Sequence, residues 1–341
     1  LVSWLLTMTG LDPTFLVGAM VPQLGTNAGI GLGRHFVIEA CEYDRSFHNY
    51  EPYVAVITNV EPDHLDYYKD FEEICESFRQ FAARVRPEGR VICHSSVAPV
   101  LAGDPRIRAR IETYGFEKDC HWRARAVRIE GRTGRFRLEC GGRNLGTFKT
   151  NIPGSHNVLN ATAAVAAAWT AGAPAKDLAH WLPGFTGCER RFQVLHHAPE
   201  LTVVDDYAHH PTELRTVIEV ARKAFAGRRL WVVFQPHQHS RTRHLLEEFA
   251  SSFLHADRVI IPDIYASRDS EEEKSLVHAR DLVARILVRD VCAYYISGFE
   301  AVLAHLEQNL GTGDVVLVCG AGNVTMLARE LVVRFGGRRS A

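Results

Sequence analysis

Five residues with acid, base or ligand chemistry lie close together in the segment VVDDYAHHPTE, residues 203–213. They are two carboxylates, a phenol and two imidazoles, within Asp205–His210. Val203 and Val204 end an apolar run that is typical of a buried strand, and Pro211 suits the first position of a helix. Ligands of α/β folds bind at the carboxyl ends of strands. The sequence therefore predicts that this strand-to-helix turn belongs to a site.

A second cluster, FQPHQHSRTR at residues 234–243, also follows a predicted strand. It contains His237 and Arg241, and an arginine suits an anionic substrate because its guanidinium matches carboxylate and phosphate groups. The imidazoles of both clusters would also suit a catalytic metal ion, so a metal-dependent hydrolase is an alternative. The ligands of such a hydrolase would be His209, His210, His237 and His239.

A third cluster of potential ligands, TNVEPDHLD at residues 58–66, follows another apolar run. Mg²⁺ in phosphate chemistry takes oxygen ligands and often only one or two protein groups. Glu39, at the end of a neighbouring predicted strand, would face the same crevice. The acidic residues could equally be solvated or cap the next helix. The groups in the loop are Glu61, Asp63, His64 and Asp66.

Two further segments suit a nucleotide. PGSHNVLN, residues 153–160, opens an alanine-rich helix, where backbone N–H groups favour anions and amide or imidazole side chains can bind a purine edge. Its alternative role is simple helix capping by Asn157. GCERRF, residues 187–192, pairs Arg190 with Arg191 for bidentate phosphate contact, or forms a solvated charge pair at a hinge.

The elements that would hold these turns form two α/β groups. Periodicity predicts strands at 35–40, 53–59 and 90–93, helices at 70–84 and 157–172, and antiparallel hairpins within 111–150 with turns at Gly131, Gly134, Gly141 and Gly142. Strands near 201–204, 229–234, 258–262, 291–296 and 314–319 alternate with helices, which predicts a parallel doubly wound sheet. The glycine-rich turn 318–325 could approach phosphate, although close packing is the stronger explanation.

Bulk composition narrows the class of protein. A chain of 341 residues suggests two domains, and a net charge of −1 gives no general attraction to nucleic acid or anionic membranes. Eight cysteines without regular spacing predict reduced thiols in a cytoplasmic protein. The apolar run 1–11 is too short for a membrane span, so we expect a helix of a soluble protein there. Composition does not indicate an oligomeric state.

Six segments resemble, in order along the chain, the Mur ligases of bacterial peptidoglycan synthesis. They are TNVEPDHLDYY, PGSHNVLNA, GCERRFQ, DDYAHHPTE, FQPHQHSRTR and GAGNVT. The resemblance covers essentially the whole chain and implies a central ATP-binding α/β domain with a hairpin region, residues 1–185, followed by a Rossmann-like ligase domain, residues 186–341. The family often has Arg-Tyr where Gln238-His239 stand, so one substrate-facing cation is lost.

The resemblance also implies ATP-dependent amide formation with ATP and Mg²⁺. A carboxylate of UDP-N-acetylmuramate would attack the γ-phosphate, and the amine of L-alanine would attack the acyl phosphate. His156, Asn157 and Asn160 would hold adenine, and Asp206 the ribose. Carried over by position, the metal ligands are Glu39 and His64; the ATP-binding residues His156, Asn157, Asn160, Arg190, Arg191 and Asp206; the substrate-binding residues Tyr207, His209, His210, His237 and Arg241; and the catalytic residues His209, His64 and Arg191.

The phosphate-binding GxxGKT/S loop of the family has no counterpart in the chain, because GTNAGIGLG at residues 25–33 lacks the Lys-Ser/Thr pair. The run at Leu1 resembles the helix that follows that loop. We therefore expect that the sequence begins just after it, without the UDP-binding domain, and that the chain alone has little activity. A nucleotide-binding module without catalysis is a second alternative.

Overall fold

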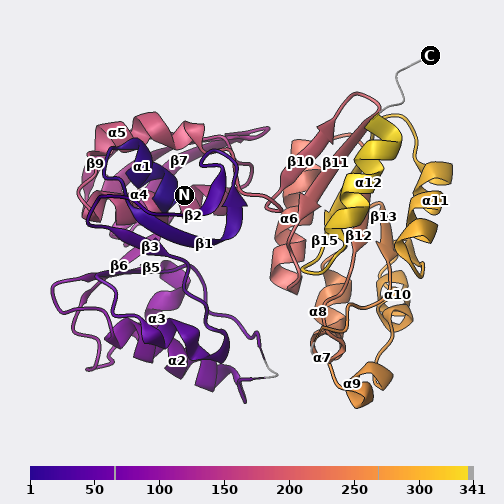
Figure 1. Ribbon diagram of the computed structural model, residues 1–341, viewed down its shortest axis with the longest axis horizontal. Coiled ribbons are helices and arrows are strands. Elements are labelled where there is room, and N and C mark those ends of the chain that lie inside the picture. The colour runs from indigo at the N-terminus through magenta and orange to yellow at the C-terminus, as the bar shows by residue number, and fades with distance from the viewer. Residues whose placement is uncertain (65–66, 268, 337–341) are drawn as a thin grey trace. The chain divides into compact units, whose positions relative to one another are not determined.

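The computed structural model describes residues 1–64, 67–267 and 269–336. Asp66 of the third cluster therefore lies outside the described residues. By its internal contacts the chain divides into two compact units, Leu1–Gly187 and Cys188–Ala341, which we call the N-terminal and C-terminal units (Figure 1). Within the described residues, no helix combines the length and the apolar character that crossing a membrane requires.

The N-terminal unit contains two sheets. A three-stranded sheet has the order β2-β1-β3, with β1 Thr14–Val21, β2 Thr26–Gly29 and β3 Phe36–Ile38. A six-stranded sheet follows chain order: β4 Val54–Ile57, β5 Arg90–His94, β6 Arg110–Gly115, β7 Trp122–Glu130, β8 Thr133–Cys140 and β9 Arg143–Thr150. Strands β4 to β7 run parallel, and β8 and β9 complete an antiparallel hairpin region.

Helices cover the six-stranded sheet of this unit. They are α2 Phe71–Ala83, α3 Ala98–Leu101, α4 Ser155–Thr170 and α5 Ala175–Trp181, while α1 Val2–Met8 packs on α4 and α5. The unit also has the 3₁₀ turns η1 Tyr43–Asn49, η2 Ser95–Val97 and η3 Leu182–Gly184. The alanines of α4 are buried against β4–β9, because small side chains allow a helix to approach a sheet closely. On β4 and β5, α2 and α3 pack through Phe81 and Leu101.

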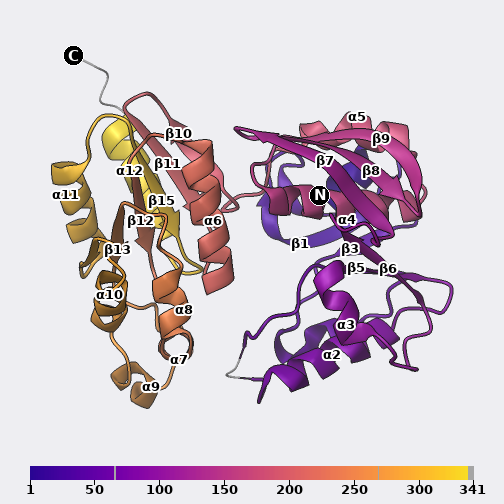
Figure 2. The ribbon, with the colours of Figure 1, turned by 180° about the vertical axis from the view of Figure 1, so that it is seen from behind.

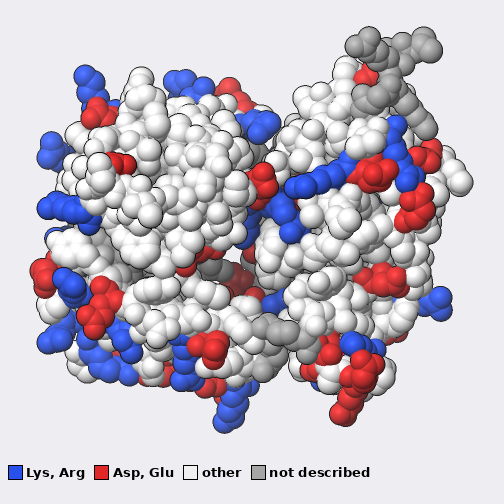
Figure 3. Space-filling view, in the orientation of Figure 1, with Lys and Arg blue, Asp and Glu red and all other residues white. Residues whose placement is uncertain are grey.

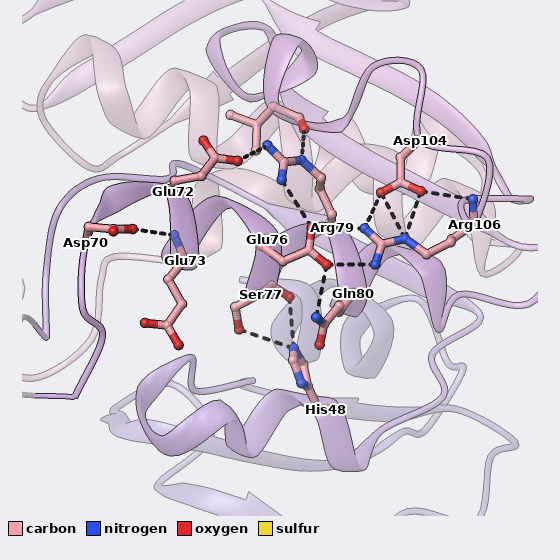
Figure 4. A network of polar contacts seen from close by, with 11 residues as sticks. His48, Asp70, Glu72, Glu73, Glu76, Ser77, Arg79, Gln80, Asp104 and Arg106 are labelled. Carbon is pink, nitrogen blue, oxygen red and sulfur yellow. Dashed lines mark hydrogen bonds and ion pairs between the residues drawn. The ribbon is translucent and has the colours of Figure 1, made fainter.

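A network of ion pairs fixes α2 on the surface of this unit (Figure 4). Asp70 caps the helix by accepting a hydrogen bond from the backbone N–H of Glu73. Arg106 donates to both Glu76 and Asp104, and its guanidinium, with smaller contributions from other donors, lowers the pKa of Glu76 to about 2. Such exposed pairs contribute little stability each. Their effect is to tie α2 to the segment that follows α3.

The C-terminal unit is built on one six-stranded sheet of order β10-β11-β15-β12-β13-β14. Its strands are β10 Gln193–His197, β11 Leu201–Asp206, β12 Leu230–Phe234, β13 Arg258–Ile261, β14 Ala293–Tyr295 and β15 Asp314–Cys319. All neighbouring pairs are parallel except β10 with β11. The central strands β12, β13 and β15 are buried and largely apolar, as expected for parallel strands that are covered on both faces.

Helices cover both faces of this sheet (Figures 1 and 2). Helices α6 Pro211–Ala224, α8 Leu246–Ser251 and α10 Ala279–Leu287 pack on one face, and α11 Phe299–Asn309 and α12 Thr325–Gly336 on the other. Short helices α7 His239–His244 and α9 Glu271–Ser275 lie in the connections. The unit is therefore the doubly wound α/β domain that the sequence predicts.

Charged residues of both signs are interspersed on the visible face of each unit (Figure 3).

Several predictions about elements need correction. Strand β6 pairs in parallel with β5, so the antiparallel region begins only at β7 and not near residue 111. Gly134 lies inside β8 rather than in a turn, where a Cβ would approach Thr150 and Val158 to about 3 Å. Strands β1, β2 and β10 were not predicted. Strands β2 and β10 are short and only partly buried, so their apolar pattern is weak. Strand β1 has eight mostly apolar residues, TFLVGAMV, and its pattern was overlooked.

Candidate active site

The carboxyl ends of β11, β12, β13 and β15 bring four connecting loops to one edge of the C-terminal sheet. Two of these loops carry the first and second sequence clusters, and one carries the glycine-rich turn. The strand β11 extends through Asp205 and Asp206, two residues further than Val204, where the apolar run ends. Both aspartates are therefore held by strand geometry rather than by a flexible turn.

Asp206 braces the start of the turn. Its Oδ2 accepts from the backbone N–H of Phe192 at 2.6 Å, and its Oδ1 from that of Ala208 at 2.7 Å. Burial raises the pKa of Asp206 to about 6, although these two hydrogen bonds act in the opposite direction. The carboxylate thus links the segment with Arg190 and Arg191 to the turn that carries Tyr207. Its predicted contact with ribose stays a prediction.

Asp205 points to the neighbouring strand end. Its Oδ2 accepts from the Thr325 hydroxyl at 2.6 Å and lies 3.9 Å from Arg190 Nε. Its Oδ1 is buried without a hydrogen-bond partner. Burial raises the pKa of this carboxyl above its usual value, and the Thr325 hydroxyl and Arg190 only partly offset that effect. A buried acceptor without a donor is costly.

Glu213 organises the two imidazoles of the turn. Its carboxylate accepts from the backbone N–H groups of His209 and His210, and lies 3.3 Å from His209 Nδ1. His210 is the N-cap of α6, and Pro211 takes the first helical position as predicted. His209 Nδ1 also lies 3.1 Å from the carbonyl of Tyr207. The fold therefore fixes the orientation of the His209 ring.

The two arginines of the linker have different surroundings. Arg190 donates to the carbonyl oxygens of Gly320 and Gly322 and lies 4.8 Å from the ring centre of Tyr207. Its side chain is 21% exposed, whereas that of Arg191 is 52% exposed and lies 3.7 Å from Glu213. Arg190 thus holds the glycine-rich turn in place, and Arg191 is the guanidinium that faces solvent.

The loop after β12 places His237 next to the first cluster. The His237 ring lies 6.4 Å from that of His209, and Arg241 Nη1 lies 3.5 Å from His237 Nδ1. Gln238, where the family often has arginine, is buried and adopts a φ of 71°. Gln238 is neutral and buried, so it does not replace the cation that an arginine would offer a substrate. His237, Arg241 and His209 therefore form one group on this edge.

A cavity of about 280 Å³ opens beside this group. Its lining includes Gln235, Asp263, Tyr265, Phe299 and Asn323. Gln235 is buried, and its Oε1 has no hydrogen-bond partner in the described structure. The backbone of the glycine-rich turn packs so closely on the Gln235 side chain that a Cβ on Gly322 would lie 2.8 Å from Gln235 Oε1. Close packing against a neighbouring loop, and not against its own helix, thus explains this glycine.

The metal ligands predicted from the third cluster lie in the N-terminal unit. Glu39 accepts a hydrogen bond from the backbone N–H of Gly18 at 2.7 Å. His64 has a backbone φ of 55°, which residues other than glycine rarely adopt. Its Nε2 lies 3.3 Å from Glu42 Oε1. That contact with His64 lowers the pKa of Glu42 despite its burial. No arrangement of three or more metal-binding side chains occurs among the residues that the structure describes.

The predicted adenine group lies at the start of α4. Asn160 Nδ2 donates to Asn157 Oδ1 at 3.2 Å, so the two amides share one face of the helix. The alternative of capping by Asn157 is wrong: the N-cap is Gly154, and Asn157 donates to the carbonyl of Pro153. Burial lowers the pKa of the neighbouring His156, which favours a neutral imidazole.

The imidazoles of the C-terminal unit have structural partners that do not suit the hydrolase alternative. His239 Nδ1 lies 3.0 Å from Asp269 Oδ2, His210 caps α6, and His237 stacks on Tyr265. Sequence reasoning missed Gln235, Tyr265 and Asp269. The last two follow the predicted strand 258–262, so the rule that ligands gather at strand ends could have indicated them.

Comparison with known families and proteins gives consistent matches. Residues 28–168 match the Mur ligase middle domain, and residues 190–322 match the Mur ligase, glutamate ligase domain. A UDP-N-acetylmuramate–L-alanine ligase of Alkaliphilus metalliredigens is 40% identical over 334 residues, which are 97% of this chain and 72% of that protein. One of Caldanaerobacter subterraneus is 40% identical over 325 residues, 95% of this chain and 70% of that protein.

Solved structures show the same fold. The crystal structure of a UDP-N-acetylmuramate–alanine ligase from Thermotoga maritima aligns with a TM-score of 0.81 at 24% identity, covering 99% of this chain and 72% of that one. A murein peptide ligase from Psychrobacter arcticus aligns with a TM-score of 0.73 at 23% identity, covering 100% of this chain and 75% of that one.

Proposed function

The chain belongs to the Mur ligase family of ATP-dependent amide-forming ligases, and on that premise we propose that it takes part in joining L-alanine to UDP-N-acetylmuramate. The observation that carries this proposal is 40% identity over 97% of the chain to a relative that is named for that reaction. The carboxyl edge of the C-terminal sheet supplies the polar groups that such a reaction requires.

The proposed reaction has two steps. A carboxylate oxygen of UDP-N-acetylmuramate attacks the γ-phosphorus of ATP, the bond to the β-phosphate oxygen breaks, and ADP leaves. The amine of L-alanine then attacks the acyl carbon, the carbon–oxygen bond to phosphate breaks, and the nitrogen loses a proton. Both steps develop negative charge on phosphate oxygens, so cationic side chains stabilise their transition states.

Arg191 is our choice for the phosphate contact, because its guanidinium is half exposed while that of Arg190 is bonded to two backbone carbonyls. Arg241 and His237, 3.5 Å apart, would meet the carboxylate of alanine or muramate. His209, oriented by Glu213, would accept the amine proton. Tyr207, His210 and Asp206 would shape the same side of the site.

Glu39 and His64 would hold Mg²⁺, which neutralises phosphate charge when bound. The Glu39 carboxylate is the kind of oxygen ligand that Mg²⁺ prefers, and Mg²⁺ in phosphate chemistry commonly takes only one or two protein groups. His64 is assigned by the position of its motif in the family. The amides of Asn157 and Asn160, together with His156, would meet adenine. A neutral His156 can accept a hydrogen bond from the adenine amino group.

The test measures formation of UDP-N-acetylmuramoyl-L-alanine by mass spectrometry. Release of ADP and phosphate is measured in the same reactions. The test is run on this chain and on the chain joined to any coding sequence upstream of Leu1. We expect product only when ATP, UDP-N-acetylmuramate and L-alanine are all present, and little from this chain alone. ATP binding without product in both proteins would favour the non-catalytic module, and hydrolysis without ATP would favour the hydrolase.

A further inference from the structure

The loop after β13, residues 262–267 and Asp269, lies along the loop after β12 that carries His237. The two loops form an isolated parallel bridge between His237 and Tyr265. Gln238 donates its backbone N–H to the carbonyl of Tyr265 at 2.8 Å, and Tyr265 donates to that of Pro236 at 2.9 Å. These backbone hydrogen bonds fix the loop after β12 against the loop after β13.

The ring of Tyr265 sets the direction of His237. The two rings are stacked, with centroids 5.4 Å apart and planes 16° from parallel. On the glycine-rich turn, a Cβ at Gly322 would lie 3.0 Å from Tyr265 Cγ, so the ring also packs directly on that backbone. A flat, rigid ring that is held by a backbone contact restricts the rotation of the imidazole stacked on it.

Asp269 holds the start of α7, whose first turn carries Arg241. Its carboxylate accepts from the backbone N–H and Nδ1 of His239, and from the backbone N–H and hydroxyl of Ser240. Burial alone would raise the pKa of Asp269, but these hydrogen bonds outweigh it and lower the pKa below its usual value. The anion is therefore a fixed anchor for residues 239–241.

We propose that Tyr265 and Asp269 are positioning residues of the ligase site: Tyr265 fixes the imidazole of His237 and Asp269 fixes the helix turn that carries Arg241. This inference rests on the proposed function only in assigning substrate contact to His237 and Arg241. Neither Tyr265 nor Asp269 needs to touch substrate. Their role is to keep two side chains within the narrow geometry that a reacting complex requires.

The kinetic test uses three variants of the protein that forms product. Tyr265→Leu removes the stacked ring, Tyr265→Phe keeps it, and Phe299→Leu alters another wall of the same cavity without touching His237. We expect kcat/KM for L-alanine to fall up to about 100-fold in Tyr265→Leu, since a displacement of about 1 Å can cost that much. The KM for ATP should stay unchanged, and the other two variants should retain most activity.

A second arm does not depend on activity. In NMR spectra of the 341-residue chain, the carbon-bound ring protons of His237, assigned by loss in His237→Gln, should lie upfield because of the Tyr265 ring current. The His237 signals should stay upfield in Tyr265→Phe and should shift toward those of a solvated histidine in Tyr265→Leu. The ring-proton signals of His278, which packs on Tyr295, are the control and should not shift. Asp269→Asn should broaden or shift the amide signals of His239 and Ser240.

The two arms separate the two claims. Absence of alanine-dependent product in wild-type protein would overturn the proposed function and leave the NMR arm to decide the positioning role. An unshifted His237 ring in Tyr265→Leu would overturn that role even if the enzyme makes product. An equal loss of kcat/KM in Tyr265→Leu and Phe299→Leu would also overturn it, since cavity volume and not the stacked ring would then matter.

Discussion

The two edges of the C-terminal sheet differ in how completely their buried polar groups are paired. At the amino edge, Asp314 accepts from the Arg229 guanidinium, the Trp231 indole N–H and the backbone N–H of Gly311. Arg228 donates to the Thr202 hydroxyl and to the carbonyls of Ala198, Gly313 and Asp314. Each of these side chains is used to join the strand starts to one another.

At the carboxyl edge, by contrast, Asp205 Oδ1 and Gln235 Oε1 are buried with no hydrogen-bond partner within the described residues. Arg190 Nε likewise has none and lies 3.9 Å from its nearest carboxylate. Unpaired buried polar atoms cost stability, and a bound ligand could supply partners to these three. We therefore assign a stabilising role to the amino edge and propose that the carboxyl edge is the binding edge.

The largest effect should come from Asp314→Ala at the amino edge. The substitution leaves the buried Trp231 N–H and the backbone N–H of Gly311 without their acceptor, so we expect a loss of about 3 kcal/mol or more in the free energy of unfolding. The Arg229 guanidinium is 40% exposed and adds little, because water can solvate it. Urea titration followed by circular dichroism measures the loss. A loss below 1 kcal/mol would mean that the amino edge is not the stabilising one.

The next effect concerns the pH dependence of stability at Asp206. Its pKa of about 6 in the folded unit exceeds the usual 3.8, so the folded state binds the proton more tightly than the unfolded state. Stability from this group is complete below pH 3.8 and is lost as pH rises through 6. Relative to Asp206→Asn, the wild type should lose up to about 3 kcal/mol across that window. Urea titrations of both proteins at several pH values measure this difference, and a constant difference would contradict the prediction.

A matched pair of arginines sharpens the comparison within the carboxyl edge. Arg191→Ala should weaken binding of Mg²⁺-ATP by about 1.5 to 3 kcal/mol, the range for hydrogen bonds to charged groups, with little change in unfolding. Arg190→Ala should lower stability, because the carbonyls of Gly320 and Gly322 lose their donor. Calorimetric titration with Mg²⁺-ATP and urea unfolding distinguish them. The reverse outcome would make Arg190 the phosphate contact.

The smallest effect should come from Gln235→Met. Because the Gln235 carbonyl oxygen is already unpaired, replacing the amide by a side chain of similar length should change the unfolding free energy by less than about 1 kcal/mol, or raise it slightly. At the amino edge, Thr202→Val is the control, since it removes an acceptor that Arg228 uses. Thermal unfolding of the two variants compares them, and a larger loss at Gln235 would break the contrast.

The sequence predicted an element correctly where adjacent residues alone determine it. The apolar run before Asp205, together with Pro211, fixed a strand and the start of a helix, and both are confirmed. The alternation of strands and helices after residue 200 likewise predicted the doubly wound unit. Tyr265 and Asp269 were missed because their roles depend on β13 lying next to β12. The strand-end rule indicates the loop after the predicted strand 258–262, but which loop it contacts is a property of the sheet that no local pattern contains.

Other errors came from packing that overrides local preference. Asn157 has the residue type of a cap, yet α4 begins earlier, at Ser155. The choice between the two arginines of GCERRF stayed open in the sequence, because only their contacts distinguish the partly buried Arg190 from the half-exposed Arg191.

Hydrogen–deuterium exchange tests most directly the claim that the carboxyl edge is the binding edge. The chain is compared with and without Mg²⁺, a non-hydrolysable ATP analogue and L-alanine. We predict slower exchange in residues 207–213, 235–241 and 320–325, and unchanged exchange in residues 226–230 and 311–314. Protection of the amino-edge segments, or no protection anywhere in the C-terminal unit, would contradict the assignment.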